Sequence, residues 1–476
     1  MNYFPLILTI VFVLIGLRTI SWHLQNWQLR EYRWDRMRAH LRTKDGQINF
    51  CNLWFFKGIF PRPHKSGRMI MTLGVLLLLF VLSFELVTKQ GNIPLTLTLI
   101  LWERTLFLTV FIAVFITRIP VEIARKVLFL KAKRIVKNSN VTRIGITGSF
   151  GKSSTKQILI HLLQSKFGAE NVLFNPGNEN NEVAIARLII RNAEFFKKGK
   201  FFIAEIGAYR RGEIKGVCQF VQPHTGIITG INAQHIELFG SQKNIQQAKF
   251  ELAESATQKV FFNADSPLLR EIAEDRNIDA VKIPLALSTA HNLTSDHHQS
   301  TFEIYGTKMT LPWSGAFFVS NALLAIESAR ECGMSVDDIA KALPKLPPLD
   351  RALNMKTLEN KATLLEDLYS ANPDGVLGAI QHLGTFEGKK IFVGIPLREL
   401  GAQAENVHRK IFTALEKMDA EVFWLKPDFS ALGKEICESQ FHGDDIEVLK
   451  KRASTLKTND AILLESRLPK TVTNIF

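Results

Sequence analysis

The sequence contains few cysteines, and most of its length carries no net charge. Four cysteines occur in 476 residues, at Cys51, Cys218, Cys332 and Cys437, without the spacing of metal ligands. This distribution excludes a disulfide framework and fits a reducing compartment. Residues 1–140 hold 20 Lys and Arg against 6 Asp and Glu, so they account for the whole net charge of +14. The basic isoelectric point therefore does not indicate nucleic acid binding, and we expect no nucleic acid partner.

The first 140 residues are rich in long apolar runs. The runs lie at 3–17, 69–87 and 93–116. Each approaches the roughly 20 residues that a helix needs to cross a bilayer, although the third contains Glu103 and Arg104. Basic residues concentrate at 18–68 and 118–137, which the positive-inside rule assigns to the cytoplasm. The pattern predicts three transmembrane helices, a basic cytoplasmic loop and a multi-pass protein of the cytoplasmic (inner) membrane with its catalytic domains in the cytoplasm.

A glycine loop follows at residues 143–155, RIGITGSFGKSST. The apolar, β-branched residues before Gly148 predict a buried strand, and a helix is expected to resume at Lys152. A strand, a glycine loop and a helix N-terminus together direct backbone N–H groups at an anion. Lys152 suits the outer phosphates of a nucleotide, and the hydroxyl of Ser153 suits magnesium. Ile146 stands where a strict G-x-x-x-x-G-K loop has its first glycine, so an ordinary turn is the alternative.

The rest of the chain alternates strands with helices. Strands are expected at 201–206, 226–231 and 260–263, and helices at 154–167, 183–196 and 242–256. This order predicts an α/β fold with a mostly parallel, doubly wound central sheet. A proline-rich break at 343–350 precedes a second, smaller α/β domain. We therefore expect a membrane region at 1–140, a nucleotide-binding central domain at 141–345 and a C-terminal domain at 346–476.

Polar residues at the ends of the expected strands are candidates for a ligand site, since ligands bind at the carboxyl ends of parallel strands. Glu205 suits a magnesium ion, with a capped surface acid as the alternative. His235 is either a ligand or a structural histidine. Asn263 and Asp265 follow the next strand, where nucleotide contacts are common. Lys249, taken alone, has the pattern of a surface lysine.

With these residues in view, the chain resembles the Mur ligase family over about 141–476. It is most similar to members that add D-alanyl-D-alanine to a muramyl peptide. The family loop T-G-[ST]-x-G-K-[ST]-[ST]-T matches Thr147–Thr155, including its non-standard glycine spacing. Further blocks of the family appear in order at 175–183, 205–214, 234–241, 248–251, 366–373 and 394–401, followed by His408.

The resemblance implies a membrane-anchored, ATP-dependent carbon–nitrogen ligase that acts through an acyl phosphate on a peptidoglycan-type precursor. Lys152 would hold phosphates, Ser153 and Glu205 one Mg²⁺, and His235 a second. Lys249 matches the lysine that family members carbamylate. The nucleotide would contact Thr147, Gly148, Ser149, Gly151, Lys152, Ser153, Ser154, Asn263, Asp265, Asn321, Asp367, Tyr369 and Asn372. The substrates, an amino acid or dipeptide and a carboxylate, would contact Asn180, Asn181, Glu399 and His408.

The chain also departs from the family pattern. Phe317 and Phe318 replace the His-Asn of the family's H-N-x-x-N, of which Asn321 survives, and Leu464 replaces a lysine. These changes concern adenine contacts and the amine pocket. The expected membrane region stands where family members have a domain that binds the uridine diphosphate of the substrate. This replacement suggests a lipid-linked carboxyl substrate. The alternatives are a ligase of the poly-γ-glutamate type and a nucleotide-binding scaffold without catalysis.

Overall fold

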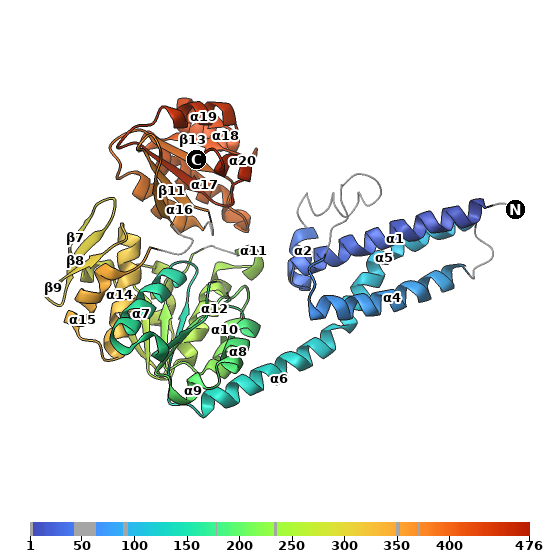
Figure 1. The fold of residues 1–476 in the computed structure, drawn as a ribbon, viewed down its shortest axis with the longest axis horizontal. Helices are drawn as coiled ribbons and strands as arrows, with labels where there is room; N and C mark the ends of the chain where they lie inside the picture. The colour runs from blue at the N-terminus through green and yellow to red at the C-terminus, as the bar shows by residue number, and fades with distance from the viewer. Residues whose placement is uncertain are drawn as a thin grey trace. The chain divides into compact units, whose positions relative to one another are not determined.

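The computed structural model describes residues 3–41, 63–88, 94–177, 179–232, 236–348, 353–368 and 372–476. His235 and Tyr369, two of the expected site residues, lie outside these ranges. The chain divides into two compact units, Met1–Leu128 and Phe129–Phe476 (Figure 1). The domain boundaries expected at 140/141 and 345/346 stay predictions.

The first unit is helical. Its helices are α1 (Phe4–Leu29), α2 (Trp34–Leu41), α4 (Gly67–Thr88) and α5 (Leu95–Ile116), and α6 (Arg118–Lys137) follows. Helix α5 packs against α1 and α4 around the buried side chains of Trp102 and Leu106. Glu103 is also buried, and its Oε1 accepts a hydrogen bond of 2.8 Å from Thr19. Three segments, Phe4–Leu29, Gly67–Leu86 and Leu95–Lys137, have the length and apolar composition to cross a membrane.

A six-stranded parallel sheet with the order β2-β3-β1-β4-β5-β6 forms the core of the second unit. Its strands are β1 (Thr142–Thr147), β2 (Val172–Phe174), β3 (Phe201–Glu205), β4 (Thr225–Ile228), β5 (Lys259–Asn263) and β6 (Val281–Leu285). The expected doubly wound parallel sheet is confirmed. β2 and β6 were not expected, because each is short or partly exposed.

Helices and a small sheet surround this core. The helices are α7 (Lys152–Phe167), α8 (Glu182–Arg191), α9 (Phe195–Lys198), α10 (Glu213–Val221), α11 (Ile236–Phe239), α12 (Gln242–Ser255), α13 (Pro267–Asp275), α14 (Ala316–Glu331) and α15 (Val336–Ala342). α7 packs against α14, and α10 packs against α12. The helix expected at 183–196 is wrong in extent, because it ends at Arg191 and α9 follows as a separate turn. An antiparallel sheet of β7 (His291–Ser295), β8 (Ser300–Ile304) and β9 (Thr307–Leu311) was also not expected.

A second six-stranded sheet, with the order β10-β11-β15-β12-β13-β14, follows along the chain. Its strands are β10 (Asn354–Thr357), β11 (Thr363–Asp367), β12 (Lys390–Gly394), β13 (Glu421–Trp424), β14 (Phe441–Gly443) and β15 (Ala461–Glu465). The helices are α16 (Pro373–Leu383), α17 (Ala404–Glu416), α18 (Ser430–Cys437), α19 (Ile446–Ser454) and α20 (Lys470–Thr473). Only β10 runs antiparallel to its neighbour. The expected smaller α/β domain is therefore confirmed.

Candidate nucleotide-binding site

The glycine loop connects the central strand β1 to α7. Strand β1 is buried between β3 and β4, so its end lies in the middle of the sheet edge. Gly151 directly precedes α7 with φ +74°, a left-handed conformation that favours glycine. A Cβ at Gly151 would lie 2.3 Å from Oδ1 of Asn321, which packs against the loop from α14. The loop conformation therefore depends on glycine at this position.

Lys152, the first residue of α7, folds back over the loop. Its Nζ donates hydrogen bonds to the carbonyl oxygens of Gly148 (2.7 Å) and Ser149 (3.3 Å). Burial lowers the pKa of Lys152, and the nearby charge of Glu205 acts in the opposite direction. The ammonium group is thus held at the mouth of the loop, where an anion would bind.

A cluster of polar side chains surrounds the carboxylate of Glu205 at the end of β3. Ser153 Oγ lies 3.1 Å from Glu205 Oε2, and Asn180 Nδ2 lies 3.1 Å from Oε1. Lys156, one turn after Lys152 on α7, places its Nζ 2.9 Å from Oε2. Burial would raise the pKa of Glu205, but the charges of Lys156 and Lys152 hold it below its usual value. The carboxylate is therefore ionised, and it offers oxygen atoms beside a serine hydroxyl.

Two other asparagines of the segment 175–183 have structural contacts. Asn175 is fully buried, accepting from the backbone N–H of Glu205 at 2.8 Å and donating to its carbonyl at 3.0 Å. Asn181, expected to contact substrate, caps the N-terminus of α8 by accepting from the N–H of Ala184 at 3.0 Å. Asn180 is therefore the asparagine that joins the Glu205 cluster. Asn175 and Lys156 were missed, because the sequence alone does not indicate their proximity to Glu205.

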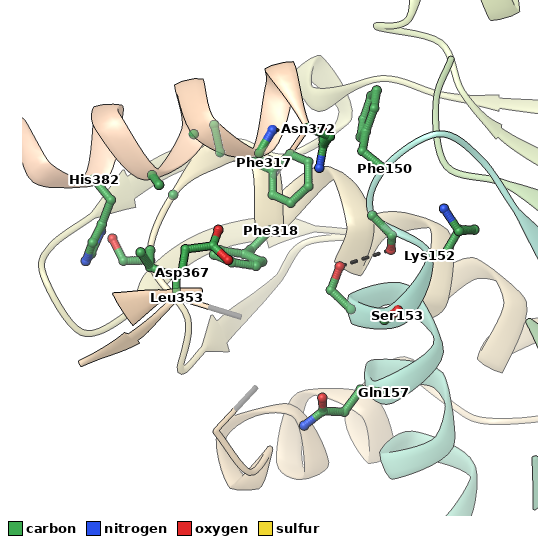
Figure 2. Close-up of a pocket in the computed structure, with 18 of the residues that line it drawn as sticks. Phe150, Lys152, Ser153, Gln157, Phe317, Phe318, Leu353, Asp367, Asn372 and His382 are labelled. Carbon is green, nitrogen blue, oxygen red and sulfur yellow. Dashed lines mark hydrogen bonds between the residues drawn. The ribbon is translucent and has the colours of Figure 1, made fainter. Parts of the chain in front are cut away.

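A cavity of about 760 Å³ opens between the glycine loop, the start of α14 and helix α16 (Figure 2). Of the expected nucleotide residues, seven line it: Ser149, Gly151, Lys152, Ser153, Ser154, Asp367 and Asn372. Burial raises the pKa of Asp367 to about 6. Asn372 also caps α16, because its Oδ1 accepts from the N–H of Gly375 at 3.0 Å.

Aromatic side chains form one wall of the cavity. Phe317 lies between Phe150 of the loop and Phe318, with ring centroids 5.8 and 5.4 Å apart, respectively. These phenylalanines occupy the positions where the resemblance leads one to expect His-Asn. Asn321, the residue that remains of that motif, donates to Ser154 Oγ at 3.1 Å. It therefore supports the loop.

Several expected site residues do not line this cavity. Asn263 donates to the carbonyl of Thr229 at 3.2 Å, and Asp265 accepts from the N–H of Leu287 at 2.6 Å. His408 uses both ring nitrogens internally, accepting from the N–H of Leu397 at 3.0 Å and bonding to the carbonyl of Ala404 at 2.7 Å. These three residues hold loops in place.

Glu399 and Lys249 also lie outside the lining of the cavity. Glu399 has a left-handed backbone (φ +64°), and its carbonyl accepts from the N–H of Glu237 at 3.4 Å. Lys249 is buried, with its Nζ 3.5 Å from the carbonyl of Ala208 and 5.7 Å from the centre of the Phe239 ring. Burial, helped by the charge of Lys152, lowers the pKa of Lys249 to about 7. Lys249 is therefore not the surface lysine that its position in the sequence indicates when it is taken alone, and its carbamylation stays a prediction.

The fold and this loop are those of a known class of protein. Two solved structures are similar to the chain: MurF from Acinetobacter baumannii, with a TM-score of 0.65, and MurF from Thermotoga maritima in complex with ADP, with 0.63. The first is 22% and the second 23% identical to this chain. Each match covers 74% of this chain, and 80% and 83% of the two solved chains, respectively. The chain thus has the Mur ligase α/β fold.

Sequence comparison finds one matching family model and several named relatives. Residues 146–329 match the Mur ligase middle domain. The UDP-N-acetylmuramoyl-tripeptide–D-alanyl-D-alanine ligase of Haemophilus influenzae is 27% identical over 67% of this chain and 71% of its own length. The ligase of the same name from Mycobacterium tuberculosis is 30% identical, over 51% of this chain and 49% of its own length. The chain therefore contains a segment that matches the Mur ligase middle domain and is similar to ligases of this name over 51–67% of its length; Mur ligases use ATP.

These relatives contradict one expectation. The homologous MurF ligases are soluble cytoplasmic enzymes, so the expected location in the cytoplasmic membrane is wrong. The three apolar segments satisfy the length and composition of a span, and that alone does not establish a membrane location. The lipid-linked carboxyl substrate, which depended on that location, has no support either.

Proposed function

We propose that the chain is an ATP-dependent ligase that joins an amine to a carboxylate of a peptidoglycan precursor. The observation that carries the proposal is the arrangement of Lys152, Ser153 and Glu205 around the glycine loop. It combines backbone N–H groups, the cations of Lys152 and Lys156 and a serine–carboxylate pair, and both lysines and Ser153 line the cavity. This donor set suits the phosphates of ATP with a hard metal ion.

The reaction would proceed in two steps. The substrate carboxylate attacks the γ-phosphorus of ATP, which gives an acyl phosphate and ADP. The amine then attacks the acyl carbon, and inorganic phosphate and a proton leave as the amide forms. Lys152 and the loop N–H groups would stabilise the charge that develops on the transferred phosphoryl group. The remaining contribution of the protein is to hold the reactants in line.

Magnesium fits the residues beside the loop. Ser153 and Glu205 offer oxygen atoms, and the described residues contain no group of three or more His, Cys, Asp or Glu that could hold a metal alone. This suits Mg²⁺, which takes few protein ligands and neutralises phosphate charge when bound. His235 as a holder of a second ion stays a prediction. Lys249, with its pKa lowered to about 7, is suited to carbamylation, because only the neutral amine adds to CO₂.

The names of the relatives suggest the substrates. Those ligases are named for a UDP-N-acetylmuramoyl-tripeptide and D-alanyl-D-alanine. We propose a muramyl-type peptide as the source of the carboxylate, and an amino acid or dipeptide as the amine. Asn180, which contacts Glu205, is the best placed of the expected substrate residues.

The test measures ATP hydrolysis by the purified full-length protein. A UDP-linked muramoyl tripeptide is supplied with a panel of D- and L-amino acids and dipeptides, and amide formation is followed by mass spectrometry. We expect hydrolysis that depends on one amine, and a loss of about 100-fold or more in kcat for Lys152→Ala. Lys166→Ala, on the exposed face of the same helix, is the control. ATP consumption that needs no amine, or no ATP consumption at all, would contradict the ligase and favour a scaffold.

A further inference from the structure

His382 on helix α16 is a buried histidine that lines the cavity. Its side chain is 5% exposed and lines the cavity, yet neither ring nitrogen has a hydrogen-bond partner among the described residues. Figure 2 shows it at the opposite end of the cavity from Lys152 and Ser153. A buried polar group without a partner is unfavourable, and such groups are rare in folded proteins. A ligand in the cavity would supply the missing partner.

The neighbours of His382 use their polar groups with one another. Thr385 Oγ1 donates to the backbone carbonyl of His382 at 2.7 Å and is bonded to Nδ1 of His297 at 2.8 Å. The ring of His297 stacks on Phe386, with centroids 4.3 Å apart, and Phe386 meets the edge of His382 at 6.0 Å. These contacts hold the imidazole in place without using either of its nitrogens, which are buried.

The cavity beside His382 suits a flat aromatic group. Phe317 and Phe318 line it, and Leu353 adds a further apolar side chain (Figure 2). Helix α16 lies close to this wall, because a Cβ at Gly378 would be 3.9 Å from Cβ of Phe317. One ligand can therefore touch both the phenylalanines and α16. A nucleobase of any kind can stack on such aromatic side chains, because every base has a π-face.

The imidazole offers a hydrogen-bond acceptor at neutral pH. Burial, with smaller contributions from His297 and His298, lowers the pKa of His382 to about 4. A neutral imidazole has one donor and one acceptor nitrogen. The phenylalanine wall has no polar atom for the exocyclic amino group of adenine. The amino N–H of adenine would therefore need a partner elsewhere in the cavity, because buried N–H groups without a partner are rarer in proteins than unpaired carbonyl oxygens.

We propose that His382 recognises the adenine of the nucleotide by accepting a hydrogen bond from its exocyclic amino group, with the base against Phe317 and Phe318. The proposal rests on the ATP-dependent function proposed above. It assigns recognition of the base to α16, since the side chains of Phe317 and Phe318 carry no polar atom. His382 would then set the specificity for the nucleotide without acting on the reacting atoms.

Binding measurements on the full-length protein test the proposal. The probes are ATP, the triphosphate of purine riboside, which lacks the amino group, and tripolyphosphate, which lacks the nucleoside. In His382→Phe the Kd for ATP should rise about ten-fold, as expected for one lost hydrogen bond to a buried group. The Kd for tripolyphosphate should not change, which also reports that the loop is folded. The wild type should prefer ATP over the purine riboside analogue, and the variant should not.

Two further variants separate recognition from packing. His382→Gln, which keeps an acceptor, should recover part of the preference for ATP. His291→Phe, at an exposed position on β7 outside the lining of the cavity, is the control and should bind all three probes as the wild type does. Equal weakening of ATP and tripolyphosphate in His382→Phe, or an unchanged preference for the amino group, would overturn the proposal. A wild type that bound neither ATP nor tripolyphosphate would overturn both this proposal and the ATP-dependent function on which it rests, whereas a wild type that bound both but formed no amide would overturn the ligase function alone.

Discussion

The Nζ atom of Lys156 lies 2.9 Å from Oε2 of Glu205, and the two side chains are only 8% and 2% exposed. Removing one partner of a buried pair leaves the other charge without compensation. We expect Lys156→Met to lower the free energy of unfolding by about 3–5 kcal/mol, measured by chemical denaturation. The same variant should weaken nucleotide binding, because the carboxylate beside Ser153 would take up a proton or move.

A matched control for this change lies on the same helix. Lys166 pairs with Asp338 at 2.7 Å, but both side chains are well exposed. Solvent screens such a pair, so Lys166→Met should have a much smaller effect on unfolding. If the two variants unfolded at the same denaturant concentration, the buried pair would not have the importance that its geometry indicates.

The glycine loop could be predicted from the sequence because its signal is local. A β-branched strand, the glycines and Gly-Lys-Ser follow one another along the chain, and the structure places them as expected. Lys156 could not be recognised as a site residue, because it lies on α7 while its partner Glu205 lies at the end of β3, far along the chain. Only the parallel pairing of β1 with β3 brings the two together. Likewise, nothing local marks His382 as a residue of the cavity.

The strand-end rule brings Glu205 beside the loop, whereas Asn263 and Asp265 lie farther along the same edge of the sheet. β3 lies directly beside β1, whereas β5 is separated from β1 by β4. A residue at the end of β5 is therefore displaced by two strand spacings, roughly 10 Å, from the loop. The sequence gives the order of strands along the chain and not their order in the sheet, so this difference could not be foreseen.

Lys249 should make activity depend on both pH and CO₂. With its pKa at about 7, the amine is mostly charged at pH 6 and mostly neutral at pH 8. Only the neutral form gives a carbamate, so ATP hydrolysis should increase between pH 6 and 8 and with added bicarbonate. ¹³C NMR with labelled bicarbonate should detect a carbamate in the wild type. Lys249→Arg keeps the positive charge and should lose both the signal and the activity. A wild type without the resonance would contradict carbamylation.

Gly151 should be far more sensitive to substitution than another left-handed glycine. In Gly151→Ala the new Cβ meets Asn321 Oδ1 at 2.3 Å, in addition to the strain of φ +74°. Gly212 has φ +87° with nothing within 4 Å of a Cβ, so Gly212→Ala has the strain alone. We expect Gly151→Ala to be less stable than Gly212→Ala by about 1–3 kcal/mol, the range for overpacking. Equal melting temperatures would show that Asn321 moves aside freely.

Glu465 should make the stability of the protein decrease as the pH rises. It pairs in register with Asp367 across β15 and β11, it is 2% exposed, and neither carboxyl oxygen has a hydrogen-bond partner among the described residues. Burial, with the charge of Asp367, raises the pKa of Glu465 well above its usual 4.5. In the unfolded chain the group ionises above about 4.5, while the folded protein keeps it protonated. The contribution of Glu465 to the free energy of unfolding is therefore fully present below that pH. It is lost as the pH rises toward the pKa of the group in the folded protein.

Glu465→Gln tests this directly, because glutamine keeps the shape and cannot ionise. At pH 4 the variant and the wild type should unfold at similar denaturant concentrations. At pH 8 the variant should be more stable by at least about 1.4 kcal/mol, the equivalent of one pKa unit. Asp367, with its pKa raised to about 6, adds a loss of stability in both proteins between about pH 4 and 6. Glu447→Gln, whose side chain is 82% exposed, should follow the wild type at every pH. A parallel loss of stability in Glu465→Gln and the wild type up to pH 8 would contradict the prediction. The carboxyl group of Glu465 would then be ionised in the folded protein and stabilised by a cation.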